Sequence, residues 1–382
     1  MREGWIEKRF DEVFTLQMGK TPDRKNPALF EGNNTWVSIR DLGEKYISSS
    51  NECISDEAAA NINMVKEGTV IMSFKLTVGK CAIASKDLYT NEAIMAFNVK
   101  EEYKIDSSFL YYYLQNYRWE GANKAVMGQT LNKATISKHT ICIPSISVQQ
   151  SIVSELDKIN ELICLKKEQL CDYDKLAQSL FYEMFGDPVE NEKGWEVKKL
   201  GEIGELARGV SKHRPRNAPE LLGGTMPLIQ TGDVANANFY IRDYTQTYSE
   251  LGVAQSKVWR KGTLCITIAA TIGKCAILDF TACFPDSVVG FKPKESIETI
   301  FMYFIFSNMQ KMLEDFAPGV AQKNINLKIL NDLDIPIPPL SLQQLFASRI
   351  TQIEALKSEI QRTIRDLETL LASRMQYWFF GF

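Results

Sequence analysis

The chain has 382 residues, of which 44 are Lys or Arg and 47 are Asp or Glu, for a net charge of −3. This length favours two or three domains over one compact core. The slight negative charge excludes a protein whose whole surface is basic, so any nucleic-acid binding must come from local patches.

The composition also bears on location and on metal content. The sequence contains no run of about 18 uncharged apolar residues, and its first residues lack the apolar core of a signal peptide, so we expect a cytoplasmic protein. Eight cysteines without a C-x-x-C pair, together with only two histidines, favour reduced thiols over disulfides or a zinc site. We therefore expect the chain to bind no metal and no cofactor of its own.

Residues 1–146 are predicted to form a mixed α/β domain. Short β-rich runs such as 69–74 alternate with Gly, Asn, Asp and Pro residues that indicate turns. The aromatic stretch 109–119 is predicted to be a helix. Its tyrosines could stack on bases, but packing in the core fits better, because the equivalent stretch 301–306 is almost purely apolar.

Residues 147–186 are predicted to form one long helix with a coiled-coil seam, because its apolar residues recur in alternating steps of four and three. Ser147 and Gln150 have the spacing of a capping box, and Gly186 is placed to end the helix in the left-handed conformation. The seam positions are Ile152, Leu156, Ile159, Ile163, Lys166, Leu170, Tyr173, Ala177, Leu180 and Met184.

Residues 187–340 and 341–382 repeat this domain and this helix. The dipeptide at 4–5 recurs at 194–195, whereas segment 77–83 recurs 194 positions later at 271–277, so the second copy contains small insertions. Ser341 and Gln344 repeat the capping box. The second seam consists of Phe346, Ile350, Ile353, Lys357, Ile360, Ile364, Leu367, Leu371, Arg374 and Trp378. The chain is therefore a tandem duplication.

The two matched helices are predicted to bury their seams against each other. The expected fold is α+β, with an antiparallel coiled coil and two mixed α/β domains at its opposite ends, related by a pseudo-twofold axis. Lys166 and Lys357 interrupt the seam near its middle. Such polar positions commonly fix the register of a coiled coil. Alternatively, the lysine stems lie along the seam and the amines reach solvent.

The sequence contains no recognisable catalytic set. The glycine-lysine pairs at 79–80 and 273–274 resemble the end of a phosphate-binding loop, but they lack its first glycine and the Ser or Thr after the lysine. A nuclease-like set of Asp23, Glu102 and Lys104 has no supporting sequence context. We therefore expect a non-catalytic chain.

Basic and amide side chains gather in loops at matched places of the two copies. Arginine and side-chain amides can bind base edges through two hydrogen bonds, and lysine complements phosphate. Solvated basic loops and turn caps are the alternative explanation. In the first copy the candidate DNA-binding residues are Lys20, Thr21, Arg24, Lys25, Arg40, Lys80, Gln129, Asn132 and Lys133. In the second copy they are Arg208, Lys212, His213, Arg214, Arg216, Gln230, Thr231, Lys274, Gln322, Lys323 and Asn324.

This arrangement resembles the specificity subunit of a type I restriction-modification system. The resemblance covers the whole chain and rests on the order domain, long helix, domain, long helix. It is reinforced by the Gly-Lys-Thr-Pro segment at 19–22 and by the segments at 77–83 and 143–150, which recur in the second copy. The second copy departs from the pattern at 209–212, where Gly-Val-Ser-Lys replaces Gly-Lys-Thr-Pro.

The resemblance implies a subunit that reads DNA without catalysis. Each recognition domain would read one half of a split target through the major groove, and the helix pair would set the gap between the halves. Two methyltransferase subunits that use S-adenosylmethionine would dock on the helices and domains, and restriction subunits that use ATP and Mg²⁺ would join them. The alternatives are a single-chain nuclease or methyltransferase, a duplicated coiled-coil scaffold that does not read DNA, and a specificity subunit of a related restriction system.

Overall fold

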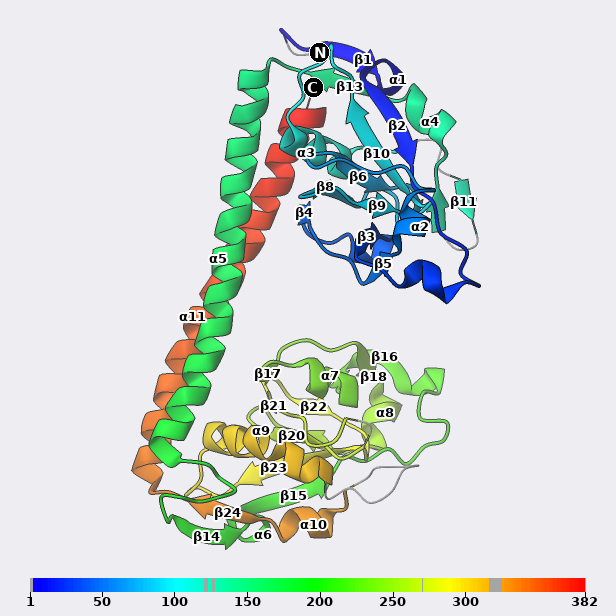
Figure 1. Ribbon diagram of the computed structural model, residues 1–382. Coiled ribbons are helices and arrows are strands. Elements are labelled where there is room, and N and C mark those ends of the chain that lie inside the picture. The colour runs from blue at the N-terminus through cyan, green and yellow to red at the C-terminus, as the bar shows by residue number, and fades with distance from the viewer. Residues whose placement is uncertain (1–2, 120–122, 126–127, 270, 316–324, 382) are drawn as a thin grey trace. The chain divides into compact units, whose positions relative to one another are not determined.

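The computed structural model describes residues 3–119, 123–125, 128–269, 271–315 and 325–381 (Figure 1). The chain divides into two compact units. Unit 1 consists of Met1–Lys167 and Arg362–Phe382, and unit 2 consists of Glu168–Gln361. Each unit contains one sheet-rich domain together with part of each of two long helices, so the predicted combination of mixed α/β domains and long helices is confirmed.

The long helices are α5 (Ile146–Phe185) and α11 (Leu340–Phe380). Contacts within both units show that they run antiparallel. In unit 1, Glu155 near the start of α5 accepts hydrogen bonds from Arg374 Nη2 at 3.1 Å and from Trp378 Nε1 at 2.9 Å near the end of α11. In unit 2, Arg349 near the start of α11 lies beside Met184 near the end of α5.

Most of the predicted seam is buried, as expected. The buried seam residues are Ile152, Leu156, Ile159, Ile163, Ala177, Phe346, Ile350, Ile353, Lys357, Ile360 and Ile364, whereas Leu170, Leu367 and Leu371 are half-buried. Near the C-terminal end of each helix, the buried residues are those that directly follow the predicted seam positions. Phe181 and Phe185 replace Leu180 and Met184 there, because that part of α5 also packs on the domain of its unit, as the 4.9 Å separation of the Phe185 and Phe301 rings shows.

Lys357 lies inside the helix pair, and only 4% of its surface is exposed. Its ammonium group pairs with Asp174 of α5 at 2.7 Å and with Glu354 of its own helix at 2.6 Å. Burial alone would lower the pKa of Lys357, but the hydrogen bonds to the two carboxylates outweigh this effect and raise the pKa above its ordinary value. The alternative in which this amine reaches solvent is therefore wrong, and a role in fixing the register fits the geometry.

The predicted capping boxes at the helix starts are wrong. Both helices begin one residue earlier than expected, so Ser147 lies within the first turn of α5. The buried residue is Gln149 rather than Gln150. Its side chain accepts a hydrogen bond from the Asp106 N–H at 2.8 Å and donates to the carbonyls of Lys104 and Pro144, each at 3.0 Å. The helix start packs directly on the domain, so a buried amide anchors it where a hydroxyl cap was expected.

Helix α11 is anchored in the same way in unit 2. The buried Gln343 accepts from the Glu298 N–H at 3.0 Å and donates to the Pro338 carbonyl at 2.8 Å. At the other end of α5, Gly186 has a φ of +78° and its N–H bonds the carbonyl of Tyr182, as the predicted left-handed helix end requires.

The domain of unit 1 is built around a five-stranded sheet covered by an aromatic helix. The strand order is β2 (Phe14–Met18), β10 (Ile94–Val99), β6 (Val70–Ser73), β8 (Cys81–Ala84) and β4 (Tyr46–Ile47). Smaller sheets join β5 (Glu52–Ile54), β3 (Asn34–Val37) and β9 (Tyr89–Thr90), then β11 (Asn123–Ala125), β12 (Gly128–Thr130) and β7 (Lys75–Leu76), and finally β1 (Ile6–Arg9) and β13 (Thr140–Ile143). The helices are α1 (Phe10–Val13), α2 (Asp56–Ala59), α3 (Ser107–Asn116) and α4 (Lys133–Lys138), with 3-10 turns η1 (Pro27–Phe30) and η2 (Ile39–Asp41). Residues 109–114 of α3 are all buried, which confirms that this aromatic stretch is core.

The domain of unit 2 repeats this strand order. Its main sheet joins β15 (Gly204–Arg208), β23 (Val288–Pro293), β20 (Leu264–Thr267), β21 (Cys275–Leu278) and β17 (Tyr240–Ile241). Further sheets join β18 (Gln246–Tyr248), β16 (Leu222–Leu228), β22 (Ala282–Cys283) and β19 (Val258–Trp259), and also β14 (Glu196–Lys199) and β24 (Asp334–Ile337). The helices are α6 (Leu200–Ile203), α7 (Thr231–Asn236), α8 (Glu250–Ala254), α9 (Thr299–Asp315) and α10 (Leu327–Asn331), with the 3-10 turn η3 (Pro219–Leu221).

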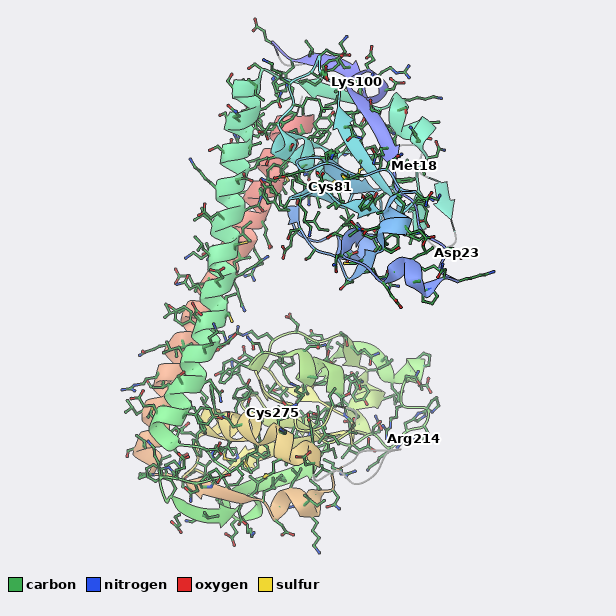
Figure 2. All side chains as sticks on the ribbon, viewed as in Figure 1. Met18, Asp23, Cys81, Lys100, Arg214 and Cys275 are labelled. Atoms are coloured by element: carbon green, nitrogen blue, oxygen red, sulfur yellow. The ribbon has the colours of Figure 1, made fainter. Side chains whose placement is uncertain are left out.

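Cysteines at equivalent positions pack as small apolar groups in the two sheets. Cys81 and Cys275, labelled in Figure 2, are both buried, and all eight cysteines are free thiols. Burial raises the pKa of Cys275 to about 12, so this thiol stays protonated at neutral pH. No helix in the described part of the chain is long and apolar enough to cross a membrane.

The contribution of the buried glutamine to the stability of the helix start can be tested by substitution. Gln149→Ala leaves one N–H and two carbonyls without their hydrogen-bond partner, so we expect a loss of about 2–3 kcal/mol of unfolding free energy. The neighbouring Gln150 is exposed, and Gln150→Ala should change that free energy by less than about 0.5 kcal/mol. Urea unfolding followed by circular dichroism compares the two variants, and equal effects would contradict the assignment of Gln149 as the anchor.

Candidate nucleic-acid interface

Predicted DNA-binding residues converge on one groove in unit 1. This groove, with a cavity volume of about 980 Å³, is called here the unit 1 groove. It is lined by Thr21, Arg24, Trp36, Ser38, Ile39, Arg40, Asn51, Glu52, Lys75, Leu76, Thr77, Asn91, Glu92 and Ala93. Three of the predicted residues, Thr21, Arg24 and Arg40, therefore come together. Lys20 and Lys25 are exposed on the same loop as Arg24.

The guanidinium of Arg24 is held in a fixed plane within this groove. Both of its terminal nitrogens donate to the Glu52 carboxylate, with an Nη2–Oε2 distance of 2.9 Å. Its central carbon lies 4.3 Å from the centre of the Phe30 ring and 5.1 Å from that of Trp36. The hydrogen bond from Arg24 lowers the pKa of Glu52, so the pair is charged at neutral pH. Arg24 is thus oriented by its neighbours and keeps further N–H donors for a ligand.

Sequence reasoning missed Asn51, Lys75 and Asn91, which also line the unit 1 groove. Asn51 donates from its backbone and its side chain to Asp41 at 2.9 and 2.7 Å. Asn51 and Asn91 lie in connections between strands, and Lys75 begins the two-residue strand β7. Nothing local in the sequence indicates that these segments face Arg24, because the pairing of distant strands brings them together.

Gly19 is needed by the protein's own packing. A Cβ atom at this position would lie 2.1 Å from the carbonyl oxygen of Thr90, and one at Gly209 would lie 2.0 Å from that of Phe284. The matched glycines thus let each loop pass close to a neighbouring strand connection. The structure thereby explains the two glycines without a phosphate contact.

In unit 2, one carboxylate interacts with two arginines of the basic loop 208–216. Arg216 pairs with Asp286 at 2.8 Å, and Arg214 lies 4.0 Å from the same carboxylate. The backbone N–H groups of Lys212 and His213 donate to the side-chain oxygen of Gln255 at 2.6 and 3.0 Å. Arg208 is exposed. Asp286 is the repeat equivalent of Glu92, which accepts a hydrogen bond from Thr21 in unit 1. Both loops are therefore held by a carboxylate at the same place.

Gln230 and Thr231 begin helix α7, as Ser38 and Ile39 begin η2 in the first copy. The Gln230 N–H donates to the Asp233 carboxylate at 2.7 Å, and its side chain donates to Gln246 at 3.2 Å. Gln246 occupies the place of Glu52 in the repeat. The equivalent polar positions of the two units thus present different chemical groups.

Several other candidates are placed elsewhere or have structural roles. Lys274 lines a separate depression of unit 2 beside Asn236 and Gln310, and its repeat equivalent Lys80 is exposed outside the lining of the unit 1 groove. Asn132 caps α4 by accepting from the Thr135 N–H at 2.8 Å, and Lys133 follows it in the first turn of that helix. Gln129 pairs through its backbone with Leu76. Gln322, Lys323 and Asn324 lie outside the described residues.

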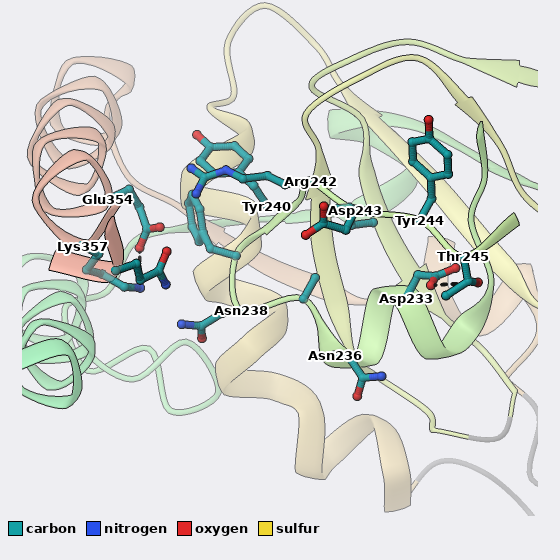
Figure 3. Close-up of a pocket in the computed structure, with 14 residues that line it drawn as sticks. Asp233, Asn236, Asn238, Tyr240, Arg242, Asp243, Tyr244, Thr245, Glu354 and Lys357 are labelled. Carbon is teal, nitrogen blue, oxygen red and sulfur yellow. Dashed lines mark hydrogen bonds and ion pairs between the residues drawn. The ribbon is translucent and has the colours of Figure 1, made fainter. Parts of the chain in front are cut away.

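A further pocket in unit 2, shown in Figure 3, contains none of the predicted DNA-binding residues that the structure describes. It has a cavity volume of about 380 Å³ and lies between residues 233–245 and helix α11. Its charged lining residues are Asp233, Asp243, Glu354, Arg242 and Lys357. Acidic groups outnumber basic ones there, so this pocket does not favour a polyanion.

Comparison with known proteins gives the family. The family model for the type I restriction modification DNA specificity domain matches residues 2–171 and again residues 192–369. The chain belongs to the type I restriction-modification specificity family. It therefore has the two recognition domains of a type I specificity subunit, as the repeat in the sequence predicted.

Two relatives agree with this assignment. The chain is 24% identical over 374 residues to the EcoprrI specificity subunit of Escherichia coli, covering 93% of this chain and 88% of that one. It is 24% identical over 293 residues to the MjaX specificity subunit of Methanocaldococcus jannaschii, covering 70% and 68%.

Two solved structures share the fold. A chain from a study of complex assembly and conformational transition in the type I R-M system matches with a TM-score of 0.68 and 18% identity, covering 100% of this chain and 99% of that one. The type I S subunit from M. genitalium matches with a TM-score of 0.57 and 16% identity, covering 98% and 96%.

The fixed guanidinium of Arg24 leads to a binding prediction. Arg24→Ala should weaken binding to a duplex that carries the target sequence about tenfold or more, because an oriented arginine contact to a base contributes about 1–3 kcal/mol. Arg9 is a matched control, since it also forms two hydrogen bonds with a carboxylate, that of Asp11, and lies outside the unit 1 groove. Fluorescence anisotropy of the subunit complex measures both variants. Equal weakening by Arg24→Ala and Arg9→Ala would contradict a role for this groove.

Proposed function

We propose that each unit reads one half of a split DNA target, unit 1 through the unit 1 groove and unit 2 through loop 208–216 with Gln230. The observation that carries this proposal is the convergence of Arg24, Arg40, Asn51, Lys75 and Asn91 from separate segments on one groove. Arginine and amide groups are the side chains that bind base edges in the major groove, and lysine complements phosphate.

The differences between the two units support two different half-sites. Arg40 of unit 1 corresponds to Gly232 of unit 2, and Glu52 corresponds to Gln246, whereas the underlying strand order is the same. Equivalent scaffolds with different side chains in the loops would bind different bases. The helix pair would then set the gap between the half-sites, because α5 and α11 are continuous helices of 40 and 41 residues and so have a fixed length.

The chain itself would be non-catalytic. S-adenosylmethionine, ATP and Mg²⁺ would be bound by partner subunits, and this chain would contribute the DNA contacts and the docking surface. Among the described residues there is no group of three or more His, Cys, Asp or Glu side chains that could hold a metal ion. Incubation of the isolated chain with DNA, S-adenosylmethionine and Mg²⁺ tests this part of the proposal, and methylation or cleavage would contradict it.

Exposed leucines on the helix pair support the docking of two methyltransferase subunits. In unit 1, Leu162 and Leu370 are 47% and 45% exposed, and in unit 2, Leu176 and Leu356 are 51% and 44% exposed. Each leucine directly precedes a seam residue at the same heptad position, so the leucines of a unit lie on the same side of the antiparallel pair.

The contacts between the helices place the two leucines of each unit in the same stretch of the pair. Leu162 and Leu370 lie between the Glu155–Arg374 and Lys167–Glu368 contacts of unit 1. Leu162 and Leu356 are 194 positions apart, and so are Leu176 and Leu370, which matches the repeat. An apolar pair that occurs once in each unit fits one partner bound twice.

Methylome sequencing of cells that express this chain with its methyltransferase subunits tests the reading of DNA. We expect one split motif methylated in both halves. Exchange of residues 1–146 for another recognition domain should change only one half, because each domain reads its half separately. Methylation without a sequence preference would favour the scaffold function, and a change in both halves would contradict the modular model.

Substitution of the exposed leucines tests the docking surface. The double variant Leu162→Ser and Leu370→Ser should lose one of two methyltransferase subunits, and the addition of Leu176→Ser and Leu356→Ser should lose both, as measured by native mass spectrometry. Leu165 is 52% exposed on α5, but its repeat equivalent is Glu359, so Leu165→Ser is the matched control and should keep both subunits. Unchanged stoichiometry in the quadruple variant would contradict this surface.

A further inference from the structure

Leu76 lines the unit 1 groove with an unusual combination of exposure and backbone conformation. Its side chain is apolar and 53% exposed. Its φ of +66° lies in the left-handed region, where residues with a Cβ atom are disfavoured. A leucine at such a position costs about 1–2 kcal/mol relative to a conformation with negative φ.

The hairpin around Leu76 imposes this conformation. The N–H of Thr77 bonds the carbonyl of Lys75 at 2.8 Å, which closes a three-residue turn with Leu76 at its centre. The Ser73 hydroxyl donates to the Thr77 carbonyl, and Leu76 pairs with Gln129 of β12. The backbone therefore holds the Leu76 Cα in one place, although glycine would adopt the same turn without strain.

Core packing does not account for the leucine. Its side chain is outside the hydrophobic core clusters of the described residues, and it contributes an apolar group to a groove whose lining includes Arg24, Arg40 and Lys75. Asn51 and Asn91 add amide groups to the same lining. The lining also contains Ile39 and Ala93 and two carboxylates, but Leu76 is the one lining residue with a positive φ, and it places an exposed aliphatic side chain beside these cations and amides.

The C5-methyl group of thymine is the apolar feature that a base pair presents in the major groove. We propose that Leu76 contacts the methyl group of one thymine in the half-site read by unit 1 and thereby selects an A·T pair at that position. This inference rests on the proposed function, because it assigns a specificity-determining residue to the unit 1 groove. Insertion of the leucine between base pairs in the minor groove is the alternative, and such insertion would not depend on the thymine methyl group, which lies in the major groove.

Replacement of thymine by deoxyuridine removes the methyl group alone, so the inference can be tested by pairing this change with Leu76→Gly. The probe is a duplex that carries the motif identified by methylome sequencing, and the binding protein is the complex of this chain with its methyltransferase subunits. With the native chain, deoxyuridine at one thymine of the unit 1 half-site should weaken binding about fourfold, the effect expected for one buried methyl group. The Leu76→Gly complex should bind the thymine and deoxyuridine duplexes equally well at that position.

The choice of glycine keeps the test independent of folding. Leu76→Gly removes the strain and no core contact, so its thermal unfolding midpoint should equal or exceed that of the native chain. Leu76→Ala, which keeps a Cβ atom, should show the same loss of discrimination. Deoxyuridine in the half-site of unit 2 or in the gap is the control, and there the native and variant complexes should respond alike.

The outcomes separate this inference from the proposed function. If the native and Leu76→Gly complexes respond alike to deoxyuridine at every thymine of the unit 1 half-site, or if that half-site contains no A·T pair, the assignment of Leu76 is wrong while sequence-specific binding stands. If the native complex binds the motif no better than a scrambled duplex, the proposed function itself fails.

Discussion

The antiparallel pairing of α5 and α11 is the constraint on which the rest of the structure depends. Each helix is apolar along one face, and a helix of this kind needs a partner to remove that face from water. The core of unit 1 joins Ile152 and Leu156 of α5 with Met375 and Phe379 of α11. Unit 1 is therefore complete only when the last part of the chain returns to the first domain, so its core depends on contacts of very long sequence separation.

Two sets of buried polar side chains determine how the apolar faces of the helices pair. Lys357 lies between two carboxylates in unit 2, and a shift of one helix along the other would separate the buried ammonium group from Asp174 and leave it with only Glu354 of its own helix. Gln149 and Gln343 tie each helix start to the loop before the aromatic helix of its domain. The hydrophobic seam stabilises the helix pair. The polar groups favour one register of the two helices over other registers, and one attachment of each helix start to its domain over other attachments.

The acidic character of the chain is compatible with a DNA-reading surface because carboxylates sit among the arginines. Glu52 holds Arg24, and Asp286 holds Arg216, so much of the local positive charge is neutralised in the free chain. Such pairs reduce attraction to any phosphate backbone and keep the guanidinium groups oriented. In the proposed function, the remaining N–H donors of these oriented guanidinium groups would contact bases, and partner subunits would supply further phosphate contacts.

The sequence by itself determined the duplication, the two long helices, most of their seam and the family, because local periodicity and spacing indicate each of these. It did not locate the C-terminal ends of the seam or the buried glutamine. Phe181 and Phe185 are buried by contact with a domain, and Gln149 is chosen over Gln150 by the loop that contacts it; no helical repeat encodes either contact. The unit 1 groove also forms only in the tertiary structure. Arg24, Asn51, Lys75 and Asn91 line it together although they lie far apart in the chain. Strand pairing brings these segments together, and it gives Leu76 the left-handed backbone that no pattern in the sequence reveals.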